Sequence, residues 1–340
     1  MENDQMVMHA IIVRITGKGE IQVDAKRKWT IGSRSLFGET NQNIHLESAG
    51  QNGLLNISIG DANGQDLYIP YSLWGCTDLN RATTVEGPYY NGVLHSTNFG
   101  ISWQLEKISD FRTWGPIFCK TKNYYYFFSC KFGEVNKGLI LWSSRKPVSG
   151  GEWNAPETVK KPLPYGGCFV ALTEGDAVHV CWLDNRHEKR YLNINLLPPN
   201  LFSDFGNYEI AYRQLKDSDV DWSKDVILSE GVFNSYNPSM SVDGDKIAIA
   251  WSGNQNTHDH WHMGPLDIYY VTSKDGGKTW AKPLKVTDTA KDGLETSAPQ
   301  VAVQNGIIHL FYVQGKENPH LHVGNQGPWP VYYQQRPFPD

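Results

Sequence analysis

Residues 182–190, WLDNRHEKR, place a dense group of charged side chains directly after an apolar run. The preceding segment VHVCW has the composition of a buried strand, which would fix the base of the charged group near the centre of a fold. Charged groups held on a rigid base can bind a polar substrate, whereas the same groups on a solvated rim form only weak ion pairs. Both interpretations are open, and the candidate substrate-binding residues here are Asp184, Arg186 and Arg190.

Residues 258–262, HDHWH, place three imidazoles at alternate positions. In an extended segment these side chains would share one side, and imidazole nitrogen is a ligand for zinc and copper. Ligands spaced at i, i+2 and i+4 are sterically awkward for a tetrahedral site, so we favour a polar loop without a metal. In that loop His260 would contact sugar hydroxyls and Trp261 would stack on a sugar ring. The sequence thus predicts no metal and no cofactor.

The composition restricts the classes of partner. The chain has 340 residues and a net charge of −5, without the basic footprint of a nucleic-acid or anionic-lipid binder. No apolar run approaches the length of a membrane span. The N-terminal segment lacks the basic region and cleavage site of a secretory leader, so a cytoplasmic location is the default, or a secreted one if the chain is a trimmed mature form. The oligomeric state is not determined by these features.

The positions of these residues follow from a repeated pattern of short β-branched and aromatic runs separated by Gly, Asn, Asp and Pro. The runs form five sets of three, and the first four sets are each followed by a Trp and a further apolar run. The intervals between Trp103, Trp153, Trp222 and Trp280 are about 50 to 70 residues, as expected for a four-stranded propeller blade. We therefore predict one all-β domain over residues 1–340, a β-propeller of four-stranded antiparallel blades.

The fifth set ends without a fourth strand. The N-terminal runs HAIIVRI and GEIQVDA would supply it, closing the ring by joining the N- and C-terminal strands and so hiding exposed sheet edges. Residues 1–50 would either complete the fifth blade or build a sixth. We favour six blades, with five as the alternative.

A turn motif occurs twice in this repeat. TSKDGGKTW at residues 272–280 contains Ser-x-Asp-x-Gly-x-Thr-Trp, and HSTNFGISW at residues 95–103 repeats it with Asn98 in place of Asp and Ser102 in place of Thr. Between the third and fourth strands of a blade this motif resembles the Asp-box (BNR repeat) of the sialidase (neuraminidase) superfamily. The resemblance implies that the turn lies opposite the ligand site. Asp275 would bind its own loop, and Trp280 would pack between blades.

The resemblance also implies a carbohydrate-active glycoside hydrolase that acts on an acidic sugar, such as sialic acid, in a glycan. Asp78 stands in the loop expected for the acid/base residue, and Tyr236 with Glu295 would form the nucleophile pair. Arginines would bind the substrate carboxylate through bidentate contacts. The candidates are Arg81, Arg112, Arg186 and Arg190.

The chain departs from the family at one motif. The expected Arg-Ile-Pro is missing, and the nearest string, LYIP, has Tyr68 in place of Arg. Two alternatives therefore stay open: a glycan-binding, lectin-like propeller without catalysis, and a polysaccharide lyase that uses a His or Tyr base. Arginines converging beside a Tyr–Glu contact would support the hydrolase, whereas His and Tyr near a single Arg would support the lyase.

Overall fold

The computed structural model describes residues 6–15, 21–31, 54–57, 61–63, 66–74, 89–98, 104–111, 113–132, 139–163, 169–184, 186, 208–254, 265–316 and 329–339. Within these ranges the fold is all-β, and every strand pairing is antiparallel. The one helical element among the described residues is a 3₁₀ turn at Ala290–Asp292. No helix in this part of the chain is long and apolar enough to cross a membrane.

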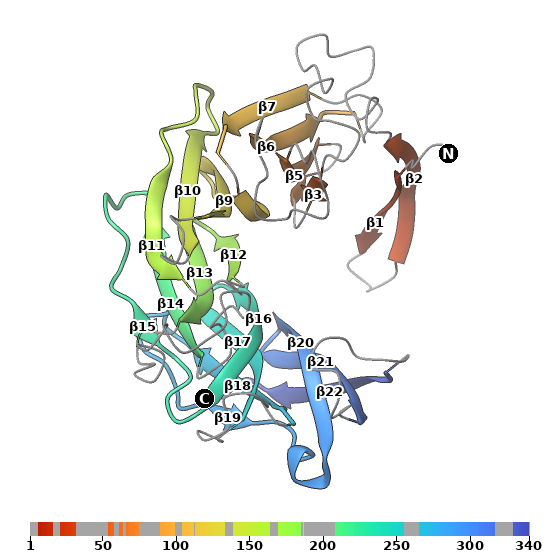
Figure 1. Cartoon of the computed structure of the whole chain (residues 1–340), viewed down its shortest axis with the longest axis vertical. Coiled ribbons are helices and arrows are strands. Elements are labelled where there is room, and N and C mark those ends of the chain that lie inside the picture. Colours follow the sequence, from red (N-terminus) through yellow and green to blue (C-terminus); the bar gives the residue numbers. More distant parts are fainter. Residues whose placement is uncertain are drawn as a thin grey trace, which may run out of the picture.

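Five sheets follow one another in chain order (Figure 1). The first sheet contains β3 (Leu54–Ile57), β4 (Asp61–Asn63), β5 (Asp66–Trp74), β6 (Tyr89–Ser96) and β7 (Gln104–Ser109). The second contains β8 (Thr113–Lys120), β9 (Tyr124–Phe132), β10 (Leu139–Pro147) and β11 (Glu157–Leu163). The third contains β12 (Phe169–Glu174), β13 (Ala177–Asp184), β14 (Glu209–Lys216) and β15 (Val226–Ile227).

The fourth sheet contains β16 (Phe233–Asp243), β17 (Lys246–Asn254), β18 (Asp267–Ser273) and β19 (Leu284–Lys285), and the fifth β20 (Leu294–Gln304), β21 (Ile307–Lys316) and β22 (Val331–Pro337). The predicted sets of strands are confirmed, although the outer strands β15 and β19 are only two residues long. The first strands of successive sheets contact one another, which places them on the inner side of the curve in Figure 1.

The hydrophobic core is divided among the interfaces between successive sheets. One cluster joins the second and third sheets, through residues such as Leu141 and Trp182, and another joins the third and fourth, through Tyr212 and Trp251. Further clusters join the first sheet to the second and the fourth to the fifth. The described cysteines Cys119, Cys130 and Cys181 are buried.

The turn after β18 has the internal bonding predicted for it. Asp275 Oδ1 accepts the backbone N–H groups of Lys278 at 3.0 Å and Thr279 at 2.9 Å. The Ser273 hydroxyl donates to Asp275 Oδ1 at 2.8 Å, and Trp280 Nε1 donates to the Gly277 carbonyl oxygen at 3.2 Å. The Thr279 and Ser273 hydrogen bonds lower the pKa of Asp275 to about 2. The carboxylate is thus committed to its own loop.

The Trp after the third strand packs on the preceding sheet in the second, third and fourth sheets. Trp280 meets Tyr212 of the third sheet edge to face, with 4.8 Å between ring centroids, and Trp222 meets Phe128 of the second sheet at 6.1 Å. Trp153 donates its Nε1–H to Glu106 of the first sheet at 2.9 Å. The predicted packing of Trp280 between adjacent sheets is confirmed.

The N-terminal strands form a hairpin, which is compatible with the predicted sixth blade. β1 (Met6–Ile15) and β2 (Ile21–Ile31) pair with each other, and β22 pairs within the described residues only with β21. A hairpin with a short connection closes a much smaller loop than a pairing between the two chain ends, which favours it entropically. In Figure 1 this hairpin lies between the first and fifth sheets. Blade number and ring closure stay predictions.

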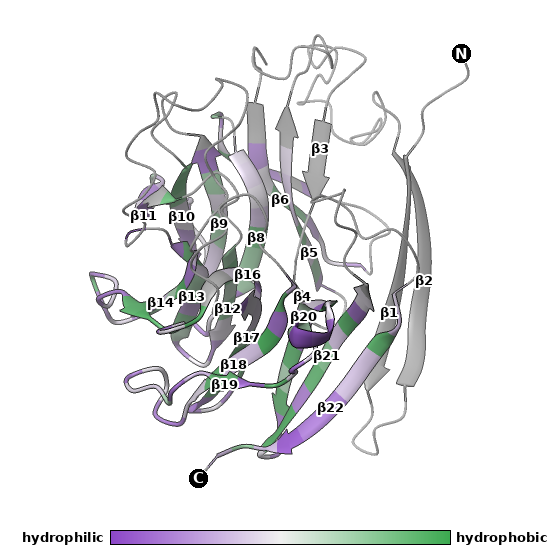
Figure 2. Ribbon diagram, turned by 60° about the horizontal axis from the view of Figure 1, so that its bottom comes forward, coloured by the Kyte–Doolittle hydropathy of each residue, from purple (hydrophilic) through white to green (hydrophobic). Residues whose placement is uncertain are grey.

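One face of the fifth sheet is left exposed by the described residues. The register pairs Phe311–Tyr333 and Val313–Val331 share this face, and Phe311, Tyr333 and Val331 are 43%, 50% and 69% exposed. Much of β22 is purple in Figure 2, which marks hydrophilic residues. This is the face that a further sheet would cover in a closed ring.

Substitution of Gly277 tests the packing of the turn against the third sheet. Gly277 has φ +86°, and an added Cβ would lie 2.2 Å from the hydroxyl oxygen of Tyr212. Gly277→Ala should destabilise the protein by about 3 kcal/mol or more, because left-handed strain and overpacking combine. Gly231→Ala is the control, since Gly231 has φ +77° with open space around it. Urea unfolding should show a clearly larger loss for Gly277→Ala, and equal losses would contradict the packing.

Candidate functional site

Three inner strands contain the same irregularity near their first residues. Gly115, Asn237 and Ala298 each have positive φ, of 64°, 51° and 51°, and each precedes a proline. The pairing registers of β8, β16 and β20 shift at these positions. Such bulges re-aim side chains and are frequent beside active sites.

Two of these residues are not glycines. A positive φ is strained for Ala298 in particular, since its Cβ approaches the following carbonyl. Strain of this kind persists only where the surroundings enforce it, and it concentrates at functional sites. The bulged ends of the inner strands are therefore the candidate site, and we name this region the inner-strand rim (Trp114, Tyr236 and Glu295 with Trp329).

Glu295 and Trp329 lie together at this rim. Glu295 is the register partner of Gly315, so its side chain points to the same face as the position of an added Gly315 Cβ. That Cβ would lie 2.3 Å from the Trp329 ring, which shows that the indole covers Gly315. A partly exposed carboxylate and a partly exposed indole thus share one face at the start of the fifth sheet.

The other rim residues come from the second and fourth sheets. Trp114, the second residue of β8, is 54% exposed and stands directly before the bulge at Gly115. The ring of Tyr236 packs edge to face on Tyr208, with 5.1 Å between centroids, at the margin of the cluster between the third and fourth sheets. The predicted pairing of Tyr236 with Glu295 stays a prediction.

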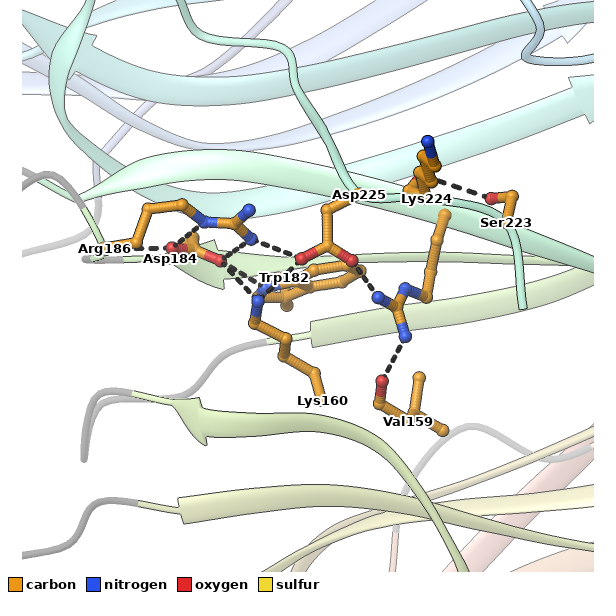
Figure 3. A network of polar contacts seen from close by, with 9 residues as sticks. Val159, Lys160, Trp182, Asp184, Arg186, Ser223, Lys224 and Asp225 are labelled. Atoms are coloured by element: carbon orange, nitrogen blue, oxygen red, sulfur yellow. Dashed lines mark hydrogen bonds and ion pairs between the residues drawn. The ribbon is translucent and has the colours of Figure 1, made fainter. Parts of the chain in front are cut away.

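Asp184 and Arg186, expected to bind substrate, are engaged with each other (Figure 3). Arg186 donates from Nε to Asp184 Oδ1 at 2.8 Å and from Nη2 to Oδ2, and its backbone N–H donates to Oδ1 at 2.9 Å. Trp182 Nε1 also donates to Asp184 Oδ2, at 3.0 Å. The carboxylate, which is 3% exposed, is therefore fully surrounded by donors.

Asp225 extends this network to the second sheet. Its carboxylate accepts Arg186 Nη2 and Lys160 Nζ, both at 2.6 Å, and also pairs with Arg213 Nη2. Lys160 belongs to β11, the outer strand of the second sheet, whereas Asp184 and Arg213 belong to strands of the third sheet. Arg186 follows β13 of that sheet, and Asp225 directly precedes β15. Sequence reasoning missed Lys160, Arg213 and Asp225, because each is an ordinary charged residue until the fold brings distant segments together.

The network shifts the pKa values of Asp184, Arg186 and Asp225. Burial alone would raise the pKa of Asp184, but the hydrogen bonds from Arg186 and Trp182 outweigh it and hold the pKa below its usual value. The pKa of Asp225 is lowered in the same way, since the contacts with Lys160, Arg186 and Arg213 exceed the effect of burial. The pairing with Asp184 raises the pKa of Arg186. All these groups stay charged near neutral pH.

The remaining predicted site residues lie outside the described residues. They are Asp78, Arg81, Arg112, Arg190, His260 and Trp261. The described part of the chain contains no group of three or more His, Cys, Asp or Glu side chains that could hold a metal ion. The HDHWH segment, residues 258–262, falls outside that part.

No family model matches the chain. The fold is similar to the GH93 alpha-L-arabinofuranosidase of Fusarium graminearum in complex with arabinobiose, at 13% identity and a TM-score of 0.44, over 82% of this chain and 85% of that chain. It is also similar to the GH62 alpha-L-arabinofuranosidase catalytic domain of Coprinopsis cinerea, at 10% identity and a TM-score of 0.39, over 82% of this chain and 90% of that chain.

A third similar structure is a GH43_1 enzyme from Xanthomonas citri, at 12% identity and a TM-score of 0.39, over 78% of this chain and 87% of that chain. These similarities are too low to assign an activity or a residue role to this chain. None of the three is described as a sialidase, so the sialidase resemblance stays a prediction.

Removal of Asp225 tests whether the network holds the second and third sheets together. Asp225→Asn would leave three neighbouring cations without their common carboxylate, and we expect a loss of about 3 kcal/mol in unfolding free energy at pH 7. Asp288→Asn removes an exposed carboxylate that also contacts two lysines and should change stability little. Equal effects of the two substitutions would contradict a structural role for the network.

The same variant should change the pH dependence of stability. A carboxyl with a lowered pKa in the folded state stabilises the fold above its unfolded pKa of about 3.9, and this contribution is lost as the pH falls through the folded value. The native protein should therefore lose stability between about pH 5 and pH 3. Asp225→Asn should show a shallower loss over that interval, measured by urea unfolding at each pH.

Proposed function

We propose that the chain is a carbohydrate-active glycoside hydrolase whose site lies at the inner-strand rim. The observation that carries this proposal is the placement of Glu295 and Trp329 on one face beside the bulge at Ala298. An indole face attracts the C–H groups of a sugar ring, and a fixed carboxylate beside it can act on the glycosidic bond or its hydroxyls. Trp114 adds a second exposed indole at the same rim.

The catalytic roles follow the sequence-based assignment. Asp78 would protonate the leaving oxygen, and Tyr236 assisted by Glu295 would attack the anomeric carbon. Hydrolysis requires two such groups on either side of the bond. Bulged strands allow Tyr236 and Glu295 to be aimed from adjacent inner strands, which are connected by a hydrogen bond from Val301 N–H to Ser239 Oγ at 3.1 Å.

The substrate proposed is a glycan with an acidic sugar. Arg81, Arg112 and Arg190 would bind its carboxylate, as the family resemblance implies. Arg186 contacts two carboxylates in the network, so we assign it to positioning the segment after β13 rather than to the substrate. Fewer arginines are therefore proposed to bind the substrate carboxylate than the sequence alone suggests.

A lectin-like function without catalysis is the second candidate. It is favoured by the packing of the Tyr236 ring against Tyr208 within an apolar cluster, which suits a structural side chain as well as a nucleophile. In that case Trp114 and Trp329 would bind the glycan and no bond would be cleaved.

Turnover of aryl glycosides distinguishes the glycoside hydrolase from the lectin-like protein. A panel of sialoside, uronide, arabinofuranoside and neutral substrates should include at least one that is hydrolysed, with acidic sugars preferred. Glu295→Gln and Tyr236→Phe should each lower kcat by about 100-fold or more. Glu152→Gln, an exposed acid in the turn between β10 and β11, should leave kcat unchanged. No turnover on the whole panel, with glycan binding retained, would support the lectin and reject the hydrolase.

A further inference from the structure

A small pocket lies between the first and second sheets, at the end of the molecule opposite the inner-strand rim. Its volume is about 200 Å³, and it is lined in part by Pro147, the last residue of β10, and by Val148 and Gly150 of the turn that follows. Ligand sites for drug-sized molecules are commonly about 300–1,000 Å³, so this pocket has room for a single ring. The Asp275 turn of the fourth sheet marks this same end, because both turns connect the third strand to the fourth.

Aromatic side chains form the walls of the pocket. Tyr68, Phe118, Tyr125 and Trp153 line it. The Tyr68 and Tyr125 hydroxyl oxygens are 3.2 Å apart, and the Tyr68 and Phe118 rings stack with 4.7 Å between centroids. These contacts fix the wall before any ligand arrives, so binding would cost little side-chain entropy.

A carboxylate and an ammonium group stand at the same wall. Glu106 Oε2 accepts Lys146 Nζ at 2.8 Å and Trp153 Nε1 at 2.9 Å. The Glu106 and Lys146 side chains are 29% and 21% exposed, so both can be reached from the pocket. The carboxylate can accept one hydroxyl of a ligand while the ammonium donates to a neighbouring one.

His95 supplies a third polar group. Its ring stacks on Tyr68 with 4.3 Å between centroids, and it lines the pocket. Among the described residues no hydrogen-bond partner reaches its buried Nε2 atom. A buried polar atom without a partner is costly, and it is satisfied when a water molecule or a ligand hydroxyl occupies the pocket.

We propose that this pocket binds one neutral sugar ring, with Trp153 and Tyr125 against its C–H faces and Glu106, Lys146 and His95 at adjacent hydroxyls. The paired charges of Glu106 and Lys146 cancel, so a neutral ring fits better than an acidic one. The pocket is a second glycan contact, separated from the inner-strand rim by the length of the strands. It would hold a substrate or a glycan surface without touching the reacting bond.

The proposal is tested by measuring the binding of methyl glycosides of neutral hexoses and pentoses with saturation-transfer NMR and tryptophan fluorescence. At least one of these glycosides should bind, and Glu106→Gln and Lys146→Met should each raise its Kd by 10-fold or more. Glu152→Gln is the matched control, because Glu152 is an exposed acid in the same turn and does not line the pocket. Unfolding curves establish that each variant is folded.

The proposal for the pocket and the proposal for the inner-strand rim can be tested independently of each other. Glu295→Gln should retain the methyl glycoside binding, and Glu106→Gln should retain turnover of small aryl glycosides. Absence of binding by every glycoside tested, or binding that Glu106→Gln and Lys146→Met leave unchanged, would overturn the pocket proposal. Preferred binding of uronic or sialic acid would overturn its assignment to neutral sugars.

Discussion

The packing between successive sheets is the constraint on which the rest of the structure depends. The clusters around Leu141 and Trp182, and around Tyr212 and Trp251, each draw side chains from two neighbouring sheets. A sheet of this size exposes an apolar face in isolation and becomes stable only against its neighbours. The exposed aromatic residues of the fifth sheet show what such a face looks like where the described residues provide no neighbour.

Polar contacts reinforce the same interface at the outer side of the second and third sheets. Lys160 reaches across to Asp225 and Asp184, at 2.6 Å and 3.8 Å, while Arg213 lies over the Trp182 ring at 5.6 Å. Breaking one partner of such a network leaves buried charges uncompensated, so it specifies how the two sheets align more than it adds net stability. The sequence around Asp184 and Arg186 suggests a binding loop, but in the structure these two residues bind distant charged residues and connect the second sheet to the third.

The strand order could be predicted because alternating apolar runs and Gly-rich turns are local signals. The bonding of Asp275 to its own loop was predictable for the same reason. The partners of Arg186 were not, since Asp225 and Lys160 are brought to it only by the association of sheets. The pairing of β1 with β2 is a local hairpin, whereas closure of a ring at β22 would depend on contacts between the two ends of the chain and stays a prediction. The place of Trp329 over Gly315 was not predictable either, because it depends on the register of β20 and β21.

The inner strands differ in backbone conformation between the two ends of the molecule. At one end they are bulged, and the strain at Ala298 is sustained because Val301 and Val303 are fixed by hydrogen bonds to Ser239 and Ser241. At the other end the turns satisfy their own polar groups, as Asp275 does, and their Trp residues fill the interfaces. Strain is tolerated only where such rigid packing lies behind it. The two ends are therefore linked. The internally bonded turns make the packing of the sheets rigid, and this rigid packing allows the strained backbone at the inner-strand rim to persist.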